Sequence, residues 1–312
     1  MITKKIVFLD RDTLPNSVSL KEITFPHELT CFPYTKSDEI LSRVKDANII
    51  ITNKVKISQE VIASAHNLEL IVIAATGTDV IDLVACEERN IAVKNVTDYA
   101  SKTVPEHTFA LMLNLRRNIN AYYQSVRNGR WIESNQFCFF DYKIKDLSGS
   151  TLGIIGNGVL GKRVAEIAKC FGMNVLISSH KGIENMDPLY TDFDEVIRKS
   201  DIITLHCPLR ESTRNMIAER EFKMMKPEAL LINTARGGIV NENDLYYAFI
   251  KGEIAGAAFD VAVNEPPDNS ELIMKLTELP NFILTPHISW ASTEAIHTLA
   301  DIMVDNINTF YN

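Results

Sequence analysis

Short apolar runs that alternate with helix-like segments constrain the fold of this chain more than any other feature. The runs are continuous rather than alternately apolar and polar, as in strands that helices cover on both faces. They form two series along the 312 residues, at 5–9, 47–52, 68–76 and 90–96, and then at 151–156, 173–179, 201–207, 229–235, 253–261 and 282–287. Strands that alternate with helices predict parallel sheets. We therefore expect an α/β chain with two doubly wound, Rossmann-like domains and an active-site cleft between them.

Two further segments predict helices outside these series. Residues 103–129 predict one long helix, in which Thr103 and Glu106 have the spacing of a capping box and Pro105 falls in the first turn. Residues 292–311 have the periodicity of an amphipathic helix. Such a helix buries its apolar side against the rest of the protein.

Charge and cysteine content exclude several classes of function. The chain has 40 acidic residues against 32 Lys and Arg, and this net charge of −8 argues against nucleic acid or an anionic membrane as a partner. The first apolar run is short and is broken by Asp10, so we expect neither a signal segment nor a membrane span. The five cysteines are scattered without a Cys-x-x-Cys pair, which predicts a reducing, cytoplasmic location and no zinc-ribbon site.

A glycine-rich turn follows the strand predicted at 151–156. Gly156, Gly158 and Gly161 have the G-x-G-x-x-G spacing, and a helical segment comes directly after them. In this context Gly156 permits the tight turn, Gly158 lets the backbone approach a pyrophosphate, and Gly161 allows close helix–strand packing. The N-terminus of the helix adds free N–H groups for the phosphates. A glycine turn that only packs is the alternative, and the strand–turn–helix context favours a dinucleotide site.

The next strand ends without the acidic residue that often binds the adenosine ribose about 20 residues further on. Ser179 takes the expected position, and Lys181 follows it. No carboxylate is then present to repel a 2′-phosphate, and Lys181 has the charge to pair with one. The alternative is that Lys181 is a solvated turn residue, so the choice between NAD and NADP stays open.

The last three predicted strands are followed by polar side chains that suit proton-coupled hydride transfer without a metal. Arg236, Glu265 and His287 follow these strands in turn, and Asp260 ends the middle one. Carboxyl ends of parallel strands meet at one end of a sheet. An arginine fork matches the carboxylate of a 2-oxo acid and polarises its ketone. Hydride delivery to C2 then needs a proton donor that works near neutral pH, which suits histidine, and Glu265 would fix its tautomer and favour the imidazolium form.

Other histidines compete for the proton-donor role. His107 shares a helix face with apolar residues, so we expect its side chain to pack in the core rather than to donate a proton. His206 also ends a predicted strand but has no carboxylate near it in the sequence, so we expect a neighbour of the cofactor. His297 falls on the polar side of the last helix, where we expect a solvated side chain. Taken alone, His287 would be interpreted as a structural residue. It follows the last of three consecutive strands, and Arg236 and Glu265 follow the two before it, so we interpret it as catalytic.

A family resemblance extends over nearly the whole chain. The stretches GIIGNGVLG, HCPL, INTARGG, FDV with NEPP, and LTPHIS stand in this order. In them the chain resembles the D-isomer-specific 2-hydroxyacid dehydrogenases. The resemblance implies an enzyme that uses NAD(P)H, with Arg236 binding the substrate, Glu265 tuning the histidine and His287 donating the proton.

The resemblance implies further residue roles and an organisation of the chain. Backbone groups of Thr76 and Gly77 would bind the substrate carboxylate. Residues 1–99 plus 288–312 would form a discontinuous substrate domain, residues 100–287 the dinucleotide-binding domain, and the helical region after residue 100 a homodimer. Cofactor contacts are implied for Val159, Leu160, Cys207, Thr234, Arg236 and Asp260, in addition to Gly156, Gly158, Gly161, Ser179 and Lys181.

Within the family, GTDVIDL, FCFFDYKIKDLSG and PHISWAS are similar to the hydroxypyruvate reductases, also called glycerate dehydrogenases. The expected reaction is the reversible reduction of hydroxypyruvate, and of glyoxylate, to the D-2-hydroxy acid. A D-lactate-type or broad 2-oxo acid reductase is one alternative. An NAD(H)-sensing, corepressor-like binding protein with little turnover is another, and the complete Arg, Glu and His set favours an enzyme over it. Ser179 departs from the family's pattern, since many NAD-specific members carry Asp there.

Overall fold

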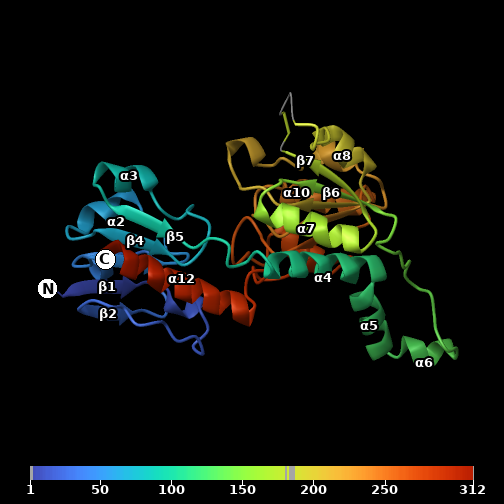
Figure 1. Cartoon of the computed structure of the whole chain (residues 1–312). Helices are drawn as coiled ribbons and strands as arrows, with labels where there is room; N and C mark the ends of the chain where they lie inside the picture. The colour runs from blue at the N-terminus through green and yellow to red at the C-terminus, as the bar shows by residue number, and fades with distance from the viewer. Residues whose placement is uncertain (1–2, 180, 183–186, 312) are drawn as a thin grey trace. The chain divides into compact units, whose positions relative to one another are not determined.

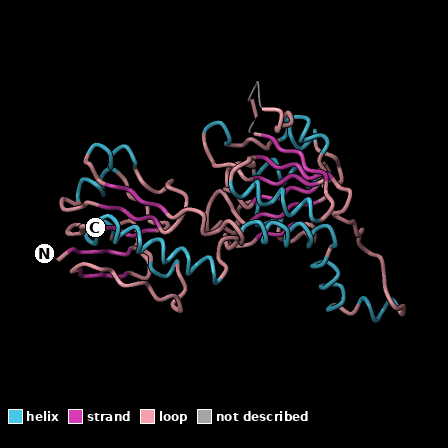
Figure 2. The backbone as a smooth tube through the Cα atoms, in the orientation of Figure 1, coloured by secondary structure: helices cyan, strands magenta, loops and turns pink. Residues whose placement is uncertain are grey.

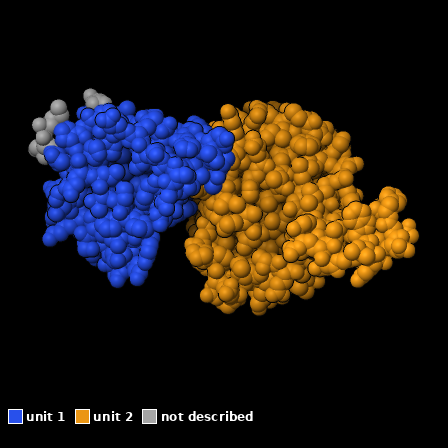
Figure 3. All heavy atoms as spheres, turned by 90° about the horizontal axis from the view of Figure 1, so that it is seen from below, with its two compact units in different colours: residues 1–100, 291–312 blue, residues 101–290 orange. Residues whose placement is uncertain are grey.

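The chain divides into two compact units. The computed structural model describes three stretches of it, residues 3–179, 181–182 and 187–311. Unit 1 comprises residues 1–100 and 291–312, and unit 2 comprises residues 101–290 (Figure 3). Each unit has its own hydrophobic core around its own sheet.

The predicted domain boundaries, 99/100 and 287/288, lie one and three residues from these divisions. The second difference has a local cause. The backbone N–H of Ser289 donates to Asp260 Oδ2 at 2.8 Å, and the indole of Trp290 donates to the carbonyl of His287 at 2.9 Å. These bonds keep the residues that follow His287 with unit 2.

Unit 1 is built on a parallel sheet with the order β2-β1-β3-β4-β5 (Figure 1). Its strands are β1 (Lys4–Phe8), β2 (His27–Cys31), β3 (Ile49–Thr52), β4 (Leu70–Ile73) and β5 (Ala92–Asn95). Its helices are η1 (Arg11–Thr13), α1 (Ile40–Val44), α2 (Gln59–Ser64), α3 (Leu83–Glu88) and α12 (Thr293–Tyr311), and α12 packs against β4. The sequence does not predict β2, because this edge strand carries polar, mostly exposed side chains rather than an apolar run.

Unit 2 contains a parallel sheet with the order β11-β10-β9-β8-β6-β7, and all of its strands are predicted by the second apolar series. The strands are β6 (Thr151–Ile155), β7 (Asn174–Ser178), β8 (Ile202–Leu205), β9 (Leu230–Asn233), β10 (Gly256–Phe259) and β11 (Phe282–Leu284). The helices are α4 (Thr103–Arg117), α5 (Ile119–Arg127), α6 (Arg130–Ser134), α7 (Val159–Cys170), α8 (Phe193–Lys199), η2 (Glu211–Thr213), α9 (Glu219–Met224), α10 (Glu242–Lys251) and α11 (Leu272–Leu276). The α/β fold with two parallel sheets is thus confirmed.

The predicted long helix over 103–129 is wrong in two respects. Asn118 has a left-handed backbone (φ 50°) that ends α4 and starts α5, and its side-chain amide donates to the carbonyl of Lys143. Asparagine adopts this conformation more readily than most residues. The capping box is also absent, because the Thr103 hydroxyl donates to the carbonyl of Ser289 instead of capping the helix. Pro105 does lie in the first turn of α4, as expected.

Residues 119–142, which we call the arm, project from the body of unit 2 (Figures 1 and 2). The arm contains α5, α6 and the loop that returns toward β6, and the Tyr122 hydroxyl holds this loop by donating to the carbonyl of Tyr142. Ile132, Phe137 and Phe140 are 86%, 89% and 84% exposed. The arm thus exposes three large apolar side chains to solvent. Among the described helices, none combines the length and the apolar character that a membrane crossing requires.

Candidate active site

The glycine turn after β6 has the geometry of a phosphate-binding loop. Gly156 has φ 103°, and a Cβ there would lie 2.5 Å from the carbonyl oxygen of His206. A Cβ on Gly161 would lie 2.1 Å from the carbonyl oxygen of Gly156. A Cβ on Gly158 would meet no atom within 4 Å, so the space in front of the N-terminus of α7 is open. The cradle therefore suits the backbone donors and helix dipole that bind a pyrophosphate.

The turn lies where the strand order of the sheet reverses. The neighbours of β6 are β7 on one side and β8 on the other, and dinucleotides bind at such a switch point. Val159 is exposed at the start of α7, and Leu160 is half-buried beside it. Cys207 follows β8, and its burial raises the pKa of the thiol to about 11, so it stays protonated. Thr234 follows β9, and its hydroxyl lies 3.1 Å from the Thr108 hydroxyl.

Ser179 and Lys181 follow β7, as the sequence predicts for the adenosine end of the site. Lys181 is exposed but is not a purely solvated residue, because its Nζ donates to Glu221 Oε1 at 2.7 Å. That carboxylate is buried and also accepts from Arg220 at 2.8 Å. The lysine charge is therefore held in place by an acidic partner, and a 2′-phosphate would compete with Glu221 for it.

The clearest catalytic feature is the pair that His287 forms with Glu265. His287 Nδ1 lies 2.7 Å from Glu265 Oε2, and Glu265 Oε1 accepts from the backbone N–H of Ala262 at 3.2 Å. The side chains of His287 and Glu265 are 23% and 33% exposed, so the pair is accessible. Within the described part of the chain, Nε2 of His287 has no hydrogen-bond partner. This nitrogen can therefore exchange a proton with a bound substrate.

Asp260 organises the backbone around His287, a role that the sequence did not predict. Its buried carboxylate accepts from the Thr285 hydroxyl at 2.5 Å and from the backbone N–H groups of Ile288 and Ser289 at 2.9 and 2.8 Å. Its carbonyl accepts from the N–H of His287 at 2.8 Å. His287 itself has φ 54°, a conformation that surrounding bonds must hold. Asp260 thus fixes the residues on both sides of the histidine.

Arg236 lies in the loop after β9, the strand next to β10 in the sheet. Its Nη1 donates to the carbonyl of Ala235 at 2.7 Å, and its own carbonyl accepts from Asn233 at 3.0 Å. The glycine that follows has a packing role, because a Cβ on Gly237 would lie 1.9 Å from the carbonyl oxygen of Ala262. The loop after β9 can therefore approach the loop after β10, which leads to Glu265.

The other sequence-predicted positions are described within their own units. Thr76 and Gly77 follow β4 in unit 1, where the Thr76 hydroxyl donates to the carbonyl of Val96 at 2.8 Å. His297 is exposed on α12, as expected. His107 is more than a packing residue, since its Nε2 lies 3.1 Å from the Thr285 hydroxyl and 3.8 Å from Asp260. Only the fold reveals this link, because 178 residues separate His107 from Thr285.

His206 is a buried base that the catalytic pair does not use. Its Nε2 lies 3.0 Å from the Thr204 hydroxyl, and its Nδ1 is buried without a partner in the described structure. Burial lowers the pKa of His206 to about 4. The ring is therefore neutral at physiological pH, unlike a proton donor.

Sequence comparison identifies related proteins over the whole length. Residues 109–289 match the family described as D-isomer specific 2-hydroxyacid dehydrogenase, NAD binding domain. A glycerate dehydrogenase from Methylorubrum extorquens is 47% identical over 310 residues, which cover 99% of this chain and 96% of the relative. A hydroxypyruvate reductase from Blautia hydrogenotrophica is 35% identical over 317 residues, which cover 98% of this chain and 96% of the relative.

Structural comparison gives the same result. A D-lactate dehydrogenase from Aquifex aeolicus, solved with NAD and lactic acid, has a TM-score of 0.82 and 27% identity, covering 98% of this chain and 95% of that one. An acyclic imino acid reductase solved with NADPH and D-Arg has a TM-score of 0.83 and 28% identity, covering 98% and 97%. The family match spans more than half of the chain, and the relatives span nearly all of it. The chain therefore belongs to the D-isomer specific 2-hydroxyacid dehydrogenases, which are NAD-dependent oxidoreductases.

Proposed function

We propose that this protein reduces hydroxypyruvate, and also glyoxylate, to the D-2-hydroxy acid, and that it catalyses the reverse reaction as a glycerate dehydrogenase. The observation that carries the proposal is the 2.7 Å hydrogen bond between His287 and Glu265. These residues follow β11 and β10, and Arg236 follows β9, the next strand in the sheet. The names of the two relatives, a glycerate dehydrogenase and a hydroxypyruvate reductase, support this substrate class.

The residues divide the work as follows. Arg236 binds the carboxylate of the 2-oxo acid and polarises the neighbouring ketone. Glu265 holds Nδ1 of His287 and stabilises the imidazolium, so that Nε2 gives its proton to the carbonyl oxygen as C2 is reduced. Asp260 keeps His287 in position through the backbone. A bound reduced nicotinamide supplies the hydride, and the glycine cradle at Gly156 to Gly161 fits its pyrophosphate.

A substrate panel tests this proposal directly. The absorbance of the reduced cofactor measures its oxidation. We expect kcat/KM to be higher for hydroxypyruvate and glyoxylate than for pyruvate or phenylpyruvate. Equal or better turnover of pyruvate would favour the D-lactate-type or broad reductase. No turnover with any of the four acids, together with tight cofactor binding, would favour the nucleotide-sensing protein.

We also propose that the protein accepts NADPH as well as NADH. Ser179 places no carboxylate at the end of β7, and Lys181 can exchange its bond with Glu221 for one with the 2′-phosphate. Lys181→Ala should raise KM for NADPH about 10-fold and change KM for NADH little. Lys199→Ala, which also removes an exposed lysine from a carboxylate pair, is the matched control. A wild-type KM for NADPH far above that for NADH would contradict the proposal.

Two further proposals concern the setting of the enzyme. The exposed apolar side chains of the arm support a homodimer, in which Ile132, Phe137 and Phe140 are buried against a second copy. Five free cysteines support a reducing, cytoplasmic location. Binding of the substrate carboxylate by Thr76 and Gly77 stays a prediction from the family resemblance.

A further inference from the structure

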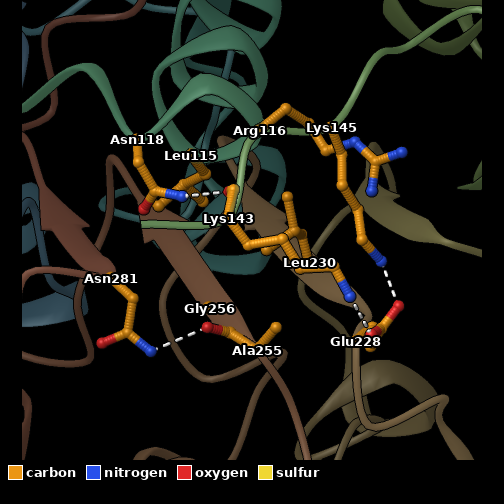
Figure 4. Close-up of a pocket in the computed structure, with 10 residues that line it drawn as sticks. All are labelled: Leu115, Arg116, Asn118, Lys143, Lys145, Glu228, Leu230, Ala255, Gly256 and Asn281. Carbon is orange, nitrogen blue, oxygen red and sulfur yellow. Dashed lines mark hydrogen bonds and ion pairs between the residues drawn. The ribbon is translucent and has the colours of Figure 1, made fainter. Parts of the chain in front are cut away.

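Figure 4 shows a pocket of unit 2 with a volume of about 190 Å³. It lies at the end of the sheet opposite to the catalytic side chains. Leu230 and Gly256 line it at the first residues of β9 and β10. Arg236 and Asp260 follow the other ends of the same two strands. Asp260 follows Gly256 by four residues along β10, so at about 3.3 Å per residue the two are about 13 Å apart. The pocket is therefore separate from the site of hydride transfer.

One wall of this pocket is apolar. Leu115 from α4 and Leu230 from β9 are almost fully buried and turn carbon atoms toward the space, with Gly256 beside them. Ala255 is exposed at the rim, where its carbonyl accepts from the Asn281 side chain at 2.7 Å. Such a wall favours an apolar group of a ligand, since burying it removes apolar surface from water.

Charged side chains from the loop after the arm and from the loop before β9 also line the pocket. Lys143 and Lys145 each bind one oxygen of the same carboxylate, Glu228, and Lys143 does so at 2.6 Å. These two ammonium groups hold the pKa of Glu228 at about 2. In the described structure, the buried Arg116 guanidinium donates at 2.7 and 3.2 Å to the carbonyl of Asp146, and it forms no hydrogen bond to a carboxylate. Lys143 and Lys145 thus bring two positive charges to the single negative charge of Glu228.

We propose that this pocket binds a small organic anion that combines a carboxylate with an apolar body. The carboxylate lies between Lys143 and Lys145 and displaces Glu228, whose side chain is 58% exposed to solvent. The apolar body lies on Leu115 and Leu230. Binding of this anion depends neither on the catalytic residues nor on which 2-oxo acid is reduced. It can therefore be tested independently of the proposed reaction.

Benzoate is a suitable probe, because it has a carboxylate on an apolar ring, and benzamide is its uncharged counterpart of the same shape. Calorimetric titration in the Arg236→Gln background removes binding at the catalytic arginine. We expect a saturable isotherm for benzoate with a dissociation constant on the order of 1 mM, and binding of benzamide at least about 10-fold weaker.

Variants of the pocket separate this site from surface binding. Lys143→Ala with Lys145→Ala should weaken benzoate binding at least about 10-fold, and Ala255→Phe should abolish it by filling the rim from an exposed position. Glu228→Gln should tighten it about 3- to 10-fold, because the competing carboxylate is removed. Lys223→Ala, which breaks an exposed Lys–Glu pair elsewhere, is the control and should change nothing. No saturable isotherm, equal binding of benzamide, or unchanged binding in the double lysine variant would each overturn the proposal.

Discussion

At the scale of single residues, the bond between His287 Nδ1 and Glu265 leaves Nε2 as the atom that can donate the proton. His287→Ala should lower kcat by about 10²–10⁴-fold and leave the dissociation constant of the reduced cofactor unchanged. Adding Glu265→Ala to His287→Ala should lower kcat little further, because the two residues act as a unit. Steady-state kinetics and calorimetry measure both quantities. His297→Ala, at an exposed position on α12, is the control, and a fully active His287→Ala protein would exclude the proposed mechanism.

The residue His206 gives a second prediction, which concerns stability rather than rate. Burial lowers its pKa from 6.5 to about 4, so between these values the unfolded chain binds more protons than the folded one. The free energy of unfolding should therefore fall as pH falls from 6.5 to 4, by up to about 3 kcal/mol.

Denaturant unfolding of wild type and His206→Gln across this range tests that expectation. The variant removes the titrating ring and keeps an amide that can reach the Thr204 hydroxyl, so its free energy of unfolding should fall less steeply with pH. His297→Gln should follow the wild-type curve. Parallel curves for wild type and His206→Gln would show that the pKa of His206 does not differ between the folded and the unfolded chain.

The catalytic residues differ in how far the sequence predicts them. Arg236, Glu265 and His287 each follow an apolar run, and the rule that ligands bind at the carboxyl ends of parallel strands suggests a common location. The bonds from Asp260 to Thr285, and from Thr285 to His107, join residues that are 25 and 178 positions apart. No periodicity or motif encodes such contacts, because they depend on how α4 packs on the sheet.

At the scale of secondary-structure elements, apolar runs predict buried strands well and exposed elements poorly. Every strand of unit 2 and four strands of unit 1 are predicted, since burial on both faces leaves a continuous apolar run. The edge strand β2 is missed because one side of it has no neighbour and its residues are polar. The break between α4 and α5 is missed because Asn118 is compatible with a helix in sequence, and its bond to Lys143 is a tertiary contact.

The exposed apolar side chains of the arm predict a homodimer. Each protomer has a mass of 35.1 kDa, so the protein should sediment with twice that mass. Phe137→Ser and Phe140→Ser should each raise the dimer dissociation constant by about 10-fold or more, since burying a phenylalanine contributes about 1.5–3 kcal/mol. Analytical ultracentrifugation over a range of concentrations measures this. Ile250→Ser, at an exposed apolar residue on α10, is the matched control, and a monomeric wild type would contradict the dimer.

At the scale of the whole molecule, the functional residues divide unevenly between the two units. The glycine turn, Arg236, Glu265 and His287 all belong to unit 2, and among the proposed site residues only Thr76 and Gly77 belong to unit 1. The helix α12 belongs to unit 1 although it is the last element of the chain, and Tyr311 donates to Glu69 there at 2.9 Å. Each unit has a separate core, so each can respond to a ligand by itself.

The reduced cofactor should therefore stabilise unit 2 more than unit 1. At a concentration 100 times its dissociation constant, a ligand that binds only the folded state adds about 2.7 kcal/mol to the free energy of unfolding. Hydrogen exchange of slowly exchanging amides should show this increase in β6, β8 and β9 and little change in β1, β3 and β4. The Gly156→Val variant, whose side chain would collide with the backbone at His206, should lose the increase in unit 2 without a change in unit 1. An equal increase in both sheets would instead mean that the cofactor couples the two units into one cooperative structure.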